Sequence, residues 1–277
     1  MAEVQPGAPA LDPAVPNVAR MYDYMLGGKE NYVSDRAAVA RLTEMAPSVP
    51  MFARRNREFL RRAVQFAASQ GISQFLDVGS GLPTQESVHE VAQAVDPAAR
   101  TVYVDNDPVV LAHSRALLGD TPGVAVVSGD VRDPAGLLAN PDVTALLDFS
   151  RPICVLLVAI LHFVTDAEDP AGLVAAFRDG VAPGSYLVIS HGTAHGAPPQ
   201  VAARSDDAQR VYDTATSQIA YRDPEEVSPM LAGLALVEPG LVHISQWRPP
   251  AATPFEFDGF LAAVGRTGES PPHNGSL

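Results

Sequence analysis

The sequence predicts an α/β protein built on a doubly wound, mostly parallel sheet. From Gln74 onward, short apolar runs alternate with helical patterns, as expected when parallel strands are joined by helices that cover both faces of a sheet. Near the end, only Gly240 separates two further apolar runs, and so short a connection requires an antiparallel pair. We therefore expect seven strands, five parallel and a terminal antiparallel pair, preceded by a helical cap.

Each expected strand is an apolar run that ends near a Gly, Asp or Ser, or lies beside a turn. The five parallel strands are expected within residues 74–80, 101–107, 124–130, 153–161 and 185–190, and the antiparallel pair within 234–239 and 241–247. The helices between them begin with capping and first-turn signals, namely Pro83-Thr84, Asp107-Pro108 and Asp133-Pro134.

The chain before the first strand has only helical patterns. Asn17 can cap a short helix that ends at Gly27-Gly28, Ser34 can cap a second helix through Met45, and a third runs from about Pro50 to Gly71. The expected organisation is a loose tail over residues 1–16, a helical cap over 17–71, the sheet domain over 72–264 and a disordered tail over 265–277.

Composition excludes several functional classes. The net charge of −13 opposes binding to a nucleic-acid backbone, and the basic run Ala53 to Arg62 is more typical of a solvated helix face. Cys154, the only cysteine, lies in an apolar run, and neither a disulfide framework nor a metal cluster is indicated. With no leader pattern and no apolar run of about 18 residues, we expect a cytoplasmic protein without membrane association.

The first strand ends in a glycine turn suited to a cationic ligand. In doubly wound sheets, ligands bind beyond the carboxyl ends of the strands, where this chain has Asp77, Gly79, Ser80 and Gly81. Pro83 removes an N–H group from the turn, which disfavours a pyrophosphate. The charge of Asp77 would repel phosphate and attract an amino or sulfonium group.

The second and third strands also end in acidic residues. Asp105, with Asn106 beside it, can accept hydrogen bonds from two ribose hydroxyls, and Asp130 can accept from an exocyclic adenine amine while the Val131 backbone faces a ring nitrogen. A solvated strand end and an ordinary turn are the alternative interpretations of these two positions.

These strand ends and the strand order resemble the class I, Rossmann-like methyltransferases that use S-adenosylmethionine (SAM). The resemblance implies that Asp77, Gly79, Ser80 and Gly81 hold the methionine moiety, Asp105 and Asn106 the ribose, and Asp130 and Val131 the adenine; Pro83 replaces the usual third glycine. The segments PNVARMYDYMLGGKENYVSDR, FLDVGSGLPT and VYVDNDPVVLAHSR are similar to a bacterial S-adenosyl methyltransferase family formerly classed as a domain of unknown function. This similarity extends from about Val15 to Ala263 and implies SAM as cofactor, but no particular substrate.

The family resemblance implies a role for the N-terminal segment as a cover over the cofactor. We expect Arg20 to pair with the methionine carboxylate while Tyr22, Tyr24 or Tyr32 closes over it, with Gly27-Gly28 as a helix stop or hinge. The alternative is that the tyrosines only pack the cap against the core; we expect Lys29 to lie in solvent.

Methyl transfer needs a general base only if the acceptor must lose a proton. Candidates are His162 after the fourth strand and His191 after the fifth, with His195 close by, although His162 can equally be a core histidine. Tyr212, Tyr221 and Trp247 are candidates for an acceptor pocket, and Trp247 can instead be a core residue.

The sequence therefore predicts an enzyme that transfers methyl groups from SAM to a small molecule. Two alternatives stay open. A sensor or regulatory protein would bind SAM without transfer, and a nucleotide-dependent oxidoreductase would bind NAD, although Pro83 and Asp77 disfavour the latter.

Overall fold

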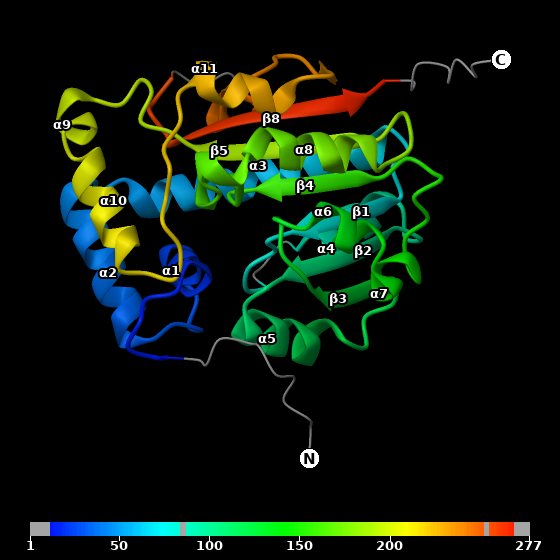
Figure 1. The fold of residues 1–277 in the computed structure, drawn as a ribbon, viewed down its shortest axis with the longest axis horizontal. Coiled ribbons are helices and arrows are strands. Elements are labelled where there is room, and N and C mark those ends of the chain that lie inside the picture. The colour runs from blue at the N-terminus through cyan, green and yellow to red at the C-terminus, as the bar shows by residue number, and fades with distance from the viewer. Residues whose placement is uncertain (1–11, 84–86, 252–254, 269–277) are drawn as a thin grey trace.

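A central sheet forms the body of the computed structural model, which describes residues 12–83, 87–251 and 255–268 (Figure 1). Within these residues the sheet has eight strands in the order β3-β2-β1-β4-β5-β8-β6, with β7 also paired to β8. The strands are β1 (Gln74–Val78), β2 (Arg100–Asp105), β3 (Val124–Ser128), β4 (Cys154–Val158), β5 (Tyr186–Gly192), β6 (Leu234–Leu236), β7 (Val242–His243) and β8 (Phe260–Thr267). The direction in which the sheet grows reverses between β1 and β4, so the switch point lies at the carboxyl end of β1.

The five predicted parallel strands are confirmed. Strand β1 pairs in parallel with β2 on one side and β4 on the other, with Phe75 opposite both Thr101 and Cys154. Strands β3 and β5 extend the sheet in the same sense.

The predicted pairing of the last two strands is wrong. Strands β6 and β7 do not pair with each other; both pair antiparallel with β8, which also pairs antiparallel with β5. The small residues of β8 gave it no strong strand pattern, yet they serve close packing, because a Cβ atom added at Gly265 would lie 2.7 Å from the Cβ of Leu234. Residues 265–267, predicted to begin a disordered tail, are the end of β8.

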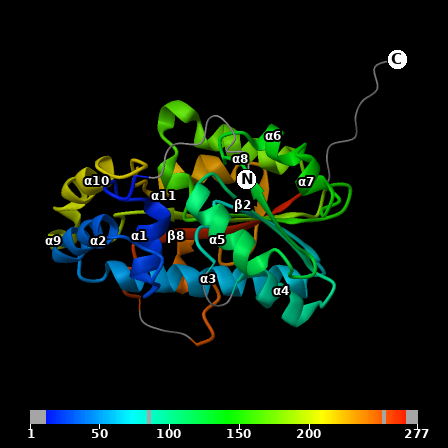
Figure 2. The same ribbon diagram turned by 90° about the horizontal axis from the view of Figure 1, so that it is seen from below.

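Helices cover both faces of the sheet (Figure 2). The α-helices are α1 (Val18–Met25), α2 (Val33–Met45), α3 (Val49–Ser69), α4 (Val88–Val95), α5 (Pro108–Leu118), α6 (Pro134–Leu138), α7 (Pro141–Thr144), α8 (Pro170–Asp179), α9 (Pro199–Ala202), α10 (Ser205–Asp213) and α11 (Pro224–Val227), with 3-10 turns η1 (Leu161–Phe163), η2 (Asp166–Glu168), η3 (Ser228–Leu231) and η4 (Ile244–Gln246). Helices α3 and α4 lie on one face, and α6, α7 and α8 on the other. None of the helices in the described residues is both long and apolar enough to span a bilayer.

The helical cap differs in composition from the predicted segment 17–71. Helices α1, α2, α9 and α10 gather at the carboxyl ends of the parallel strands (Figure 1), around a small core that includes Met21, Leu42 and Val211. Helix α3 belongs to both parts, because Ala53 packs in the cap core whereas Phe59 lies in the core beneath the sheet. Helix α3 therefore packs against both the cap and the sheet.

Most predicted helix starts are confirmed. The side chains of Asn17, Asp107 and Asp133 accept hydrogen bonds from the first-turn N–H groups of α1, α5 and α6. Ser34 is not a cap, since α2 already begins at Val33. The helix after the glycine turn begins only at Val88; of the predicted start Pro83-Thr84, Thr84 lies outside the described residues.

Candidate active site

A cavity of about 570 Å³ lies between the carboxyl ends of the parallel strands and the cap. It is lined by nine of the residues predicted to bind the cofactor or to act as a general base, namely Tyr22, Asp77, Gly79, Ser80, Gly81, Asp105, Asn106, Asp130 and His162. Three others, Arg20, Val131 and His191, do not line it. The cavity therefore joins the predicted strand-end residues to the cap in a single space.

Asp77 brings a buried negative charge to this cavity. The residue is 5% exposed, and its carboxylate has no hydrogen-bond partner among the described residues. Burial raises the pKa of Asp77 to about 7, against the opposing effect of the Arg57 guanidinium and with a smaller contribution from the nearby Asp105. A cationic ligand would compensate this charge.

Asp105 holds the glycine turn in shape. Its Oδ2 accepts from the Gly81 N–H at 2.9 Å, and its Oδ1 accepts from the Asp107 N–H at 2.9 Å. Burial nevertheless raises the pKa of this carboxyl group. Gly79 and Gly81 adopt φ values of +73° and +65°, a left-handed conformation that other residues rarely adopt. The turn thus exposes backbone to the cavity as predicted.

The ends of β2 and β3 are linked by side chains. Asn106 Nδ2 donates to Asp130 Oδ2 at 2.8 Å, and Asp130 Oδ1 accepts from the Arg132 N–H at 2.9 Å. The side chain of Val131 packs in the core on the face of the sheet that α6, α7 and α8 cover, so it does not reach the cavity.

Arg20 does not lie where the sequence predicted. Its Nε is 2.8 Å from Asp35 Oδ2 in an ion pair that is almost fully buried, and its Nη2 donates to the Val15 carbonyl at 2.9 Å. Its guanidinium also lies 4.7 Å from the ring centre of Tyr32. Because these contacts satisfy Arg20 away from the cavity, it supports the cap and does not meet a carboxylate there.

The segment between α1 and α2 is a tight, hydrogen-bonded turn. Buried Asp23 accepts from the Glu30 N–H and from Asn31 Nδ2, both at 3.0 Å. A Cβ atom at Gly28 would lie 1.9 Å from the Asp23 carboxylate, so only glycine fits without a shift. Gly27, with φ +85°, ends the helix, while Lys29 is exposed as expected.

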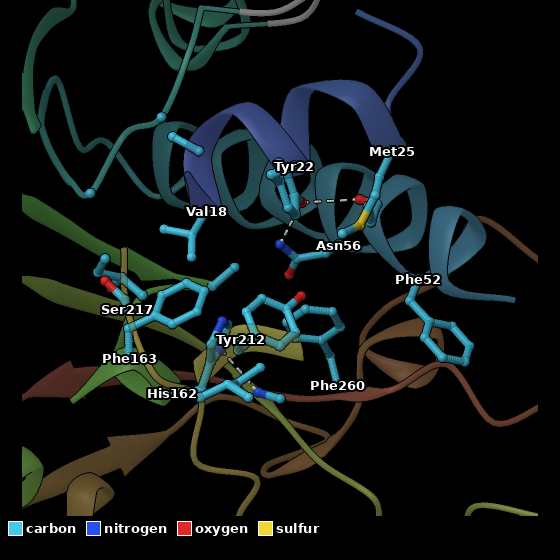
Figure 3. A pocket seen from close by; sticks show the side chains of 18 of the residues that line it. Val18, Tyr22, Met25, Phe52, Asn56, His162, Phe163, Tyr212, Ser217 and Phe260 are labelled. Carbon is cyan, nitrogen blue, oxygen red and sulfur yellow. Dashed lines mark hydrogen bonds between the residues drawn. The ribbon is translucent and has the colours of Figure 1, made fainter. Parts of the chain in front are cut away.

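Tyr22 lines the cavity and is tethered to α3 (Figure 3). Its hydroxyl donates to the Ala53 carbonyl at 3.1 Å and accepts from Asn56 Nδ2 at 2.9 Å. Asn56 Oδ1 in turn accepts from Ser190 Oγ at 2.7 Å. These bonds connect α1, α3 and β5 around the cavity.

Sequence reasoning missed Arg57 because it lies in the basic run that was interpreted as a solvated helix face. Arg57 lines the cavity together with Ala53, Asn56 and Leu60. These positions follow the i, i+3, i+4, i+7 spacing of one helix face, which is the signal that would have identified it. Its charge acts on Asp77.

The two candidate histidines lie in different environments. His162 lines the cavity beside Phe163, Tyr212 and Phe260 (Figure 3). His191 was expected to face the same space, but it is fully buried and contacts Arg222 instead, since β5 continues through Gly192.

The remaining predicted candidates also divide between cavity and core. Tyr212 and Tyr221 line the cavity, whereas His195 does not. Trp247 is also absent from the lining; it packs edge-on against Phe59 and Phe66 in the core.

This fold is that of the class I SAM-dependent methyltransferases. The chain belongs to the S-adenosyl methyltransferase family, whose model matches residues 5–268. It is 42% identical to a proposed methyltransferase from Thermobifida fusca YX (TM-score 0.86, covering 96% of this chain and 100% of that chain). It is 40% identical to a DUF574 family protein from Streptomyces avermitilis MA-4680 (TM-score 0.86, covering 92% and 99%).

A more distant structure shares the fold alone. An O-methyltransferase family protein from Burkholderia thailandensis is 13% identical, with a TM-score of 0.52 over 90% of this chain and 64% of that chain. No match was found among curated proteins. The family membership identifies the cofactor as SAM.

Proposed function

We propose that the protein transfers the methyl group of SAM to a small molecule held between the strand ends and the cap. The observation that carries this proposal is that one continuous cavity contains both the strand-end acids and an apolar region lined by cap residues. Its volume of about 570 Å³ lies within the range typical of small-molecule sites. The net charge of −13 further disfavours a nucleic-acid acceptor.

The residues at the strand ends fit the chemical groups of SAM. Bound SAM supplies an electrophilic methyl group on a positively charged sulfonium. The carboxylate of Asp77, which accepts no hydrogen bond from the described residues, suits the positive charge of the amino or sulfonium group. Asp105 and Asn106 are suited to the ribose hydroxyls, and Asp130 to the adenine amine.

Arg57 takes the role that the sequence had assigned to Arg20. It is a cationic residue of α3 on the cavity wall, close enough to Asp77 to lower the pKa of that carboxyl group. A guanidinium in this place can bind the methionine carboxylate. Arg20 then acts only through the cap that it stabilises.

The acceptor would bind on the cap side of the cavity. Tyr22, Phe163, Tyr212, Tyr221 and Phe260 bring aromatic rings to this region, and they come from the cap as well as from the strand ends. Such walls exclude water and hold a flat molecule near the cofactor, and positioning supplies much of the rate of an in-line displacement.

Binding and turnover can be tested separately. Calorimetric titration should show binding of SAM and S-adenosylhomocysteine (SAH) but not NAD, and SAH release should depend on an added small molecule from a cell extract. Transfer to the nucleic-acid fraction alone would refute the small-molecule assignment. SAM binding without any SAH release would favour a binding protein over an enzyme.

A further inference from the structure

The backbone of one residue, Gly192, forms hydrogen bonds with both His162 and His191. The carbonyl oxygen of Gly192 lies 2.9 Å from His191 Nδ1, and the N–H of Gly192 donates to His162 Nδ1 at 3.2 Å. Arg222 Nη1 lies 2.9 Å from His191 Nε2. Because a guanidinium can only donate, His191 must accept at Nε2 and carry its proton on Nδ1, where it donates to the Gly192 carbonyl.

The same reasoning fixes His162 in the opposite tautomer. A backbone N–H can only donate, so Nδ1 of His162 is the acceptor and the neutral ring carries its proton on Nε2. Nε2 has no hydrogen-bond partner among the described residues, and His162 lines the cavity. Its Nε2–H is therefore available to a ligand, whereas its lone pair is occupied by the Gly192 N–H.

The surroundings keep His162 neutral. Burial, the neighbouring His191 and the Arg222 guanidinium together hold the pKa of His162 well below its ordinary value. Burial also lowers the pKa of His191 to about 4, with a further lowering by Arg222 against the raising effect of the Gly192 carbonyl. The phenols of Tyr212 and Tyr221 also stay neutral, since burial raises their pKa values, that of Tyr221 to about 12.

Aromatic residues surround His162 on the cavity wall. The ring centres of Phe163 and Phe260 lie 4.2 Å and 5.8 Å from that of His162. In contrast, the acidic residues among the described cavity walls, Asp77, Asp105, Asp107 and Asp130, come from the ends of β1, β2 and β3. A molecule bound against His162 therefore meets flat apolar walls and one neutral N–H donor.

We propose that His162 determines acceptor specificity as a hydrogen-bond donor, and that the acceptor is an uncharged, planar, largely apolar molecule with an oxygen that binds the His162 Nε2–H. This inference rests on the proposed function and names the substrate class of the same cavity. His162 does not act as the general base. In the transfer, a lone pair of the acceptor forms the bond to the methyl carbon while the carbon–sulfur bond breaks and its electron pair stays on sulfur. A proton carried by the nucleophile leaves to water.

The tautomer is measured directly in the unmodified chain. Long-range ¹⁵N–¹H spectra of the labelled full-length protein should show a protonated Nε2 and an unprotonated Nδ1 for His162 from about pH 5.5 to pH 8.5, a range that spans the ordinary histidine pKa. A proton on Nδ1, or titration to the imidazolium within this range, would overturn the inference. This measurement needs no cofactor, so the tautomer can be determined even if the protein does not bind SAH. Failure to bind SAH would refute the proposed function and not the tautomer of His162.

The donor role is tested with two probes of nearly equal shape. With SAH present, acetophenone, which has a carbonyl oxygen, should shift the His162 Nε2–H resonance and bind about fivefold more tightly than ethylbenzene, as expected for one neutral hydrogen bond. An unperturbed resonance up to the solubility limit of acetophenone would overturn the proposal, as would equal affinity for the two probes.

Variants of His162 distinguish its role as a hydrogen-bond donor from that of a general base or of a purely structural residue. His162→Gln keeps an N–H donor and should keep most of the preference for acetophenone, whereas His162→Phe should abolish it. His195→Gln is the matched control, because His195 follows the neighbouring strand β5 but does not line the cavity; it should leave the preference unchanged. Loss of the preference in His162→Gln, with an unchanged melting temperature, would contradict the donor role.

Discussion

Replacing Asp77 by asparagine should stabilise the ligand-free protein. The native state holds this carboxyl group buried, which raises its pKa from 3.8 to about 7. A difference of about 3 pKa units corresponds to about 4 kcal/mol. Asparagine has a similar shape and carries no charge, and it forfeits no hydrogen bond to the described residues because the carboxylate makes none with them. The cost of burying the charge therefore disappears in Asp77→Asn.

The sign of the pH dependence follows from proton binding. At a pH between the pKa values of Asp77 in the unfolded and native states, the native state retains a proton that the unfolded state has lost. Asp77 therefore makes the wild type less stable as the pH rises. Between about pH 5 and pH 8 the stability advantage of Asp77→Asn over the wild type should grow by about 2.5 kcal/mol.

Urea unfolding of the ligand-free wild type and variant at both pH values measures this change. Asp120→Asn, which removes an exposed carboxylate outside the cavity, is the control and should show no such growth. An advantage of Asp77→Asn that is the same at both pH values would refute the assignment of a buried carboxylate whose pKa is raised in the native state.

The same carboxylate couples cofactor binding to pH. A positive group of SAM beside Asp77 favours the ionised form, so the affinity for SAM should rise with pH up to about 7, by at most tenfold per pH unit. In Asp77→Asn the affinity should be lower and nearly independent of pH. Calorimetric titrations across this range test the coupling, and a wild-type affinity that does not change with pH would place the cation elsewhere.

Three further substitutions test the cavity and the cap. Asp105→Ala should weaken SAH binding by about 1–3 kcal/mol through lost hydrogen bonds, and unchanged calorimetric affinity would remove it from the site. Arg20→Met leaves Asp35 buried without its ion-pair partner and should lower the free energy of unfolding, measured in urea, by about 3–5 kcal/mol. If this variant instead bound SAH more weakly but adenosine equally well, Arg20 would contact the methionine carboxylate in the cavity. Gly28→Ala should lower the melting temperature, because its Cβ atom would collide with the Asp23 carboxylate; an unchanged melting temperature would show that the turn adjusts freely.

The cofactor half of the cavity was predictable because its signals are local. Asp77, Asp105 and Asp130 each follow an apolar run, and the rule that ligands bind beyond the strand ends brings them together without further information. Strand β8 was missed because its alanines and glycine resemble no strand pattern, and its role depends on neighbours distant in the sequence. Arg20 was misplaced because its partner Asp35 lies fifteen residues further along the chain and across a turn.

The acceptor half has no comparable local signal. Its walls come from α1, α3, the turn after β4 and the segment around α10. Many of the side chains that these elements contribute are apolar, and such side chains are equally typical of a core. What distinguishes His162 from a core histidine is that its ring lines the cavity while its Nδ1 accepts from the Gly192 N–H, and no sequence pattern encodes this arrangement. Because the cap helices supply these walls and we propose that the strand ends hold the cofactor, substitutions in α10 should alter acceptor choice and leave the affinity for SAH unchanged. A cap variant that changed both together would show that the two halves of the cavity are energetically coupled.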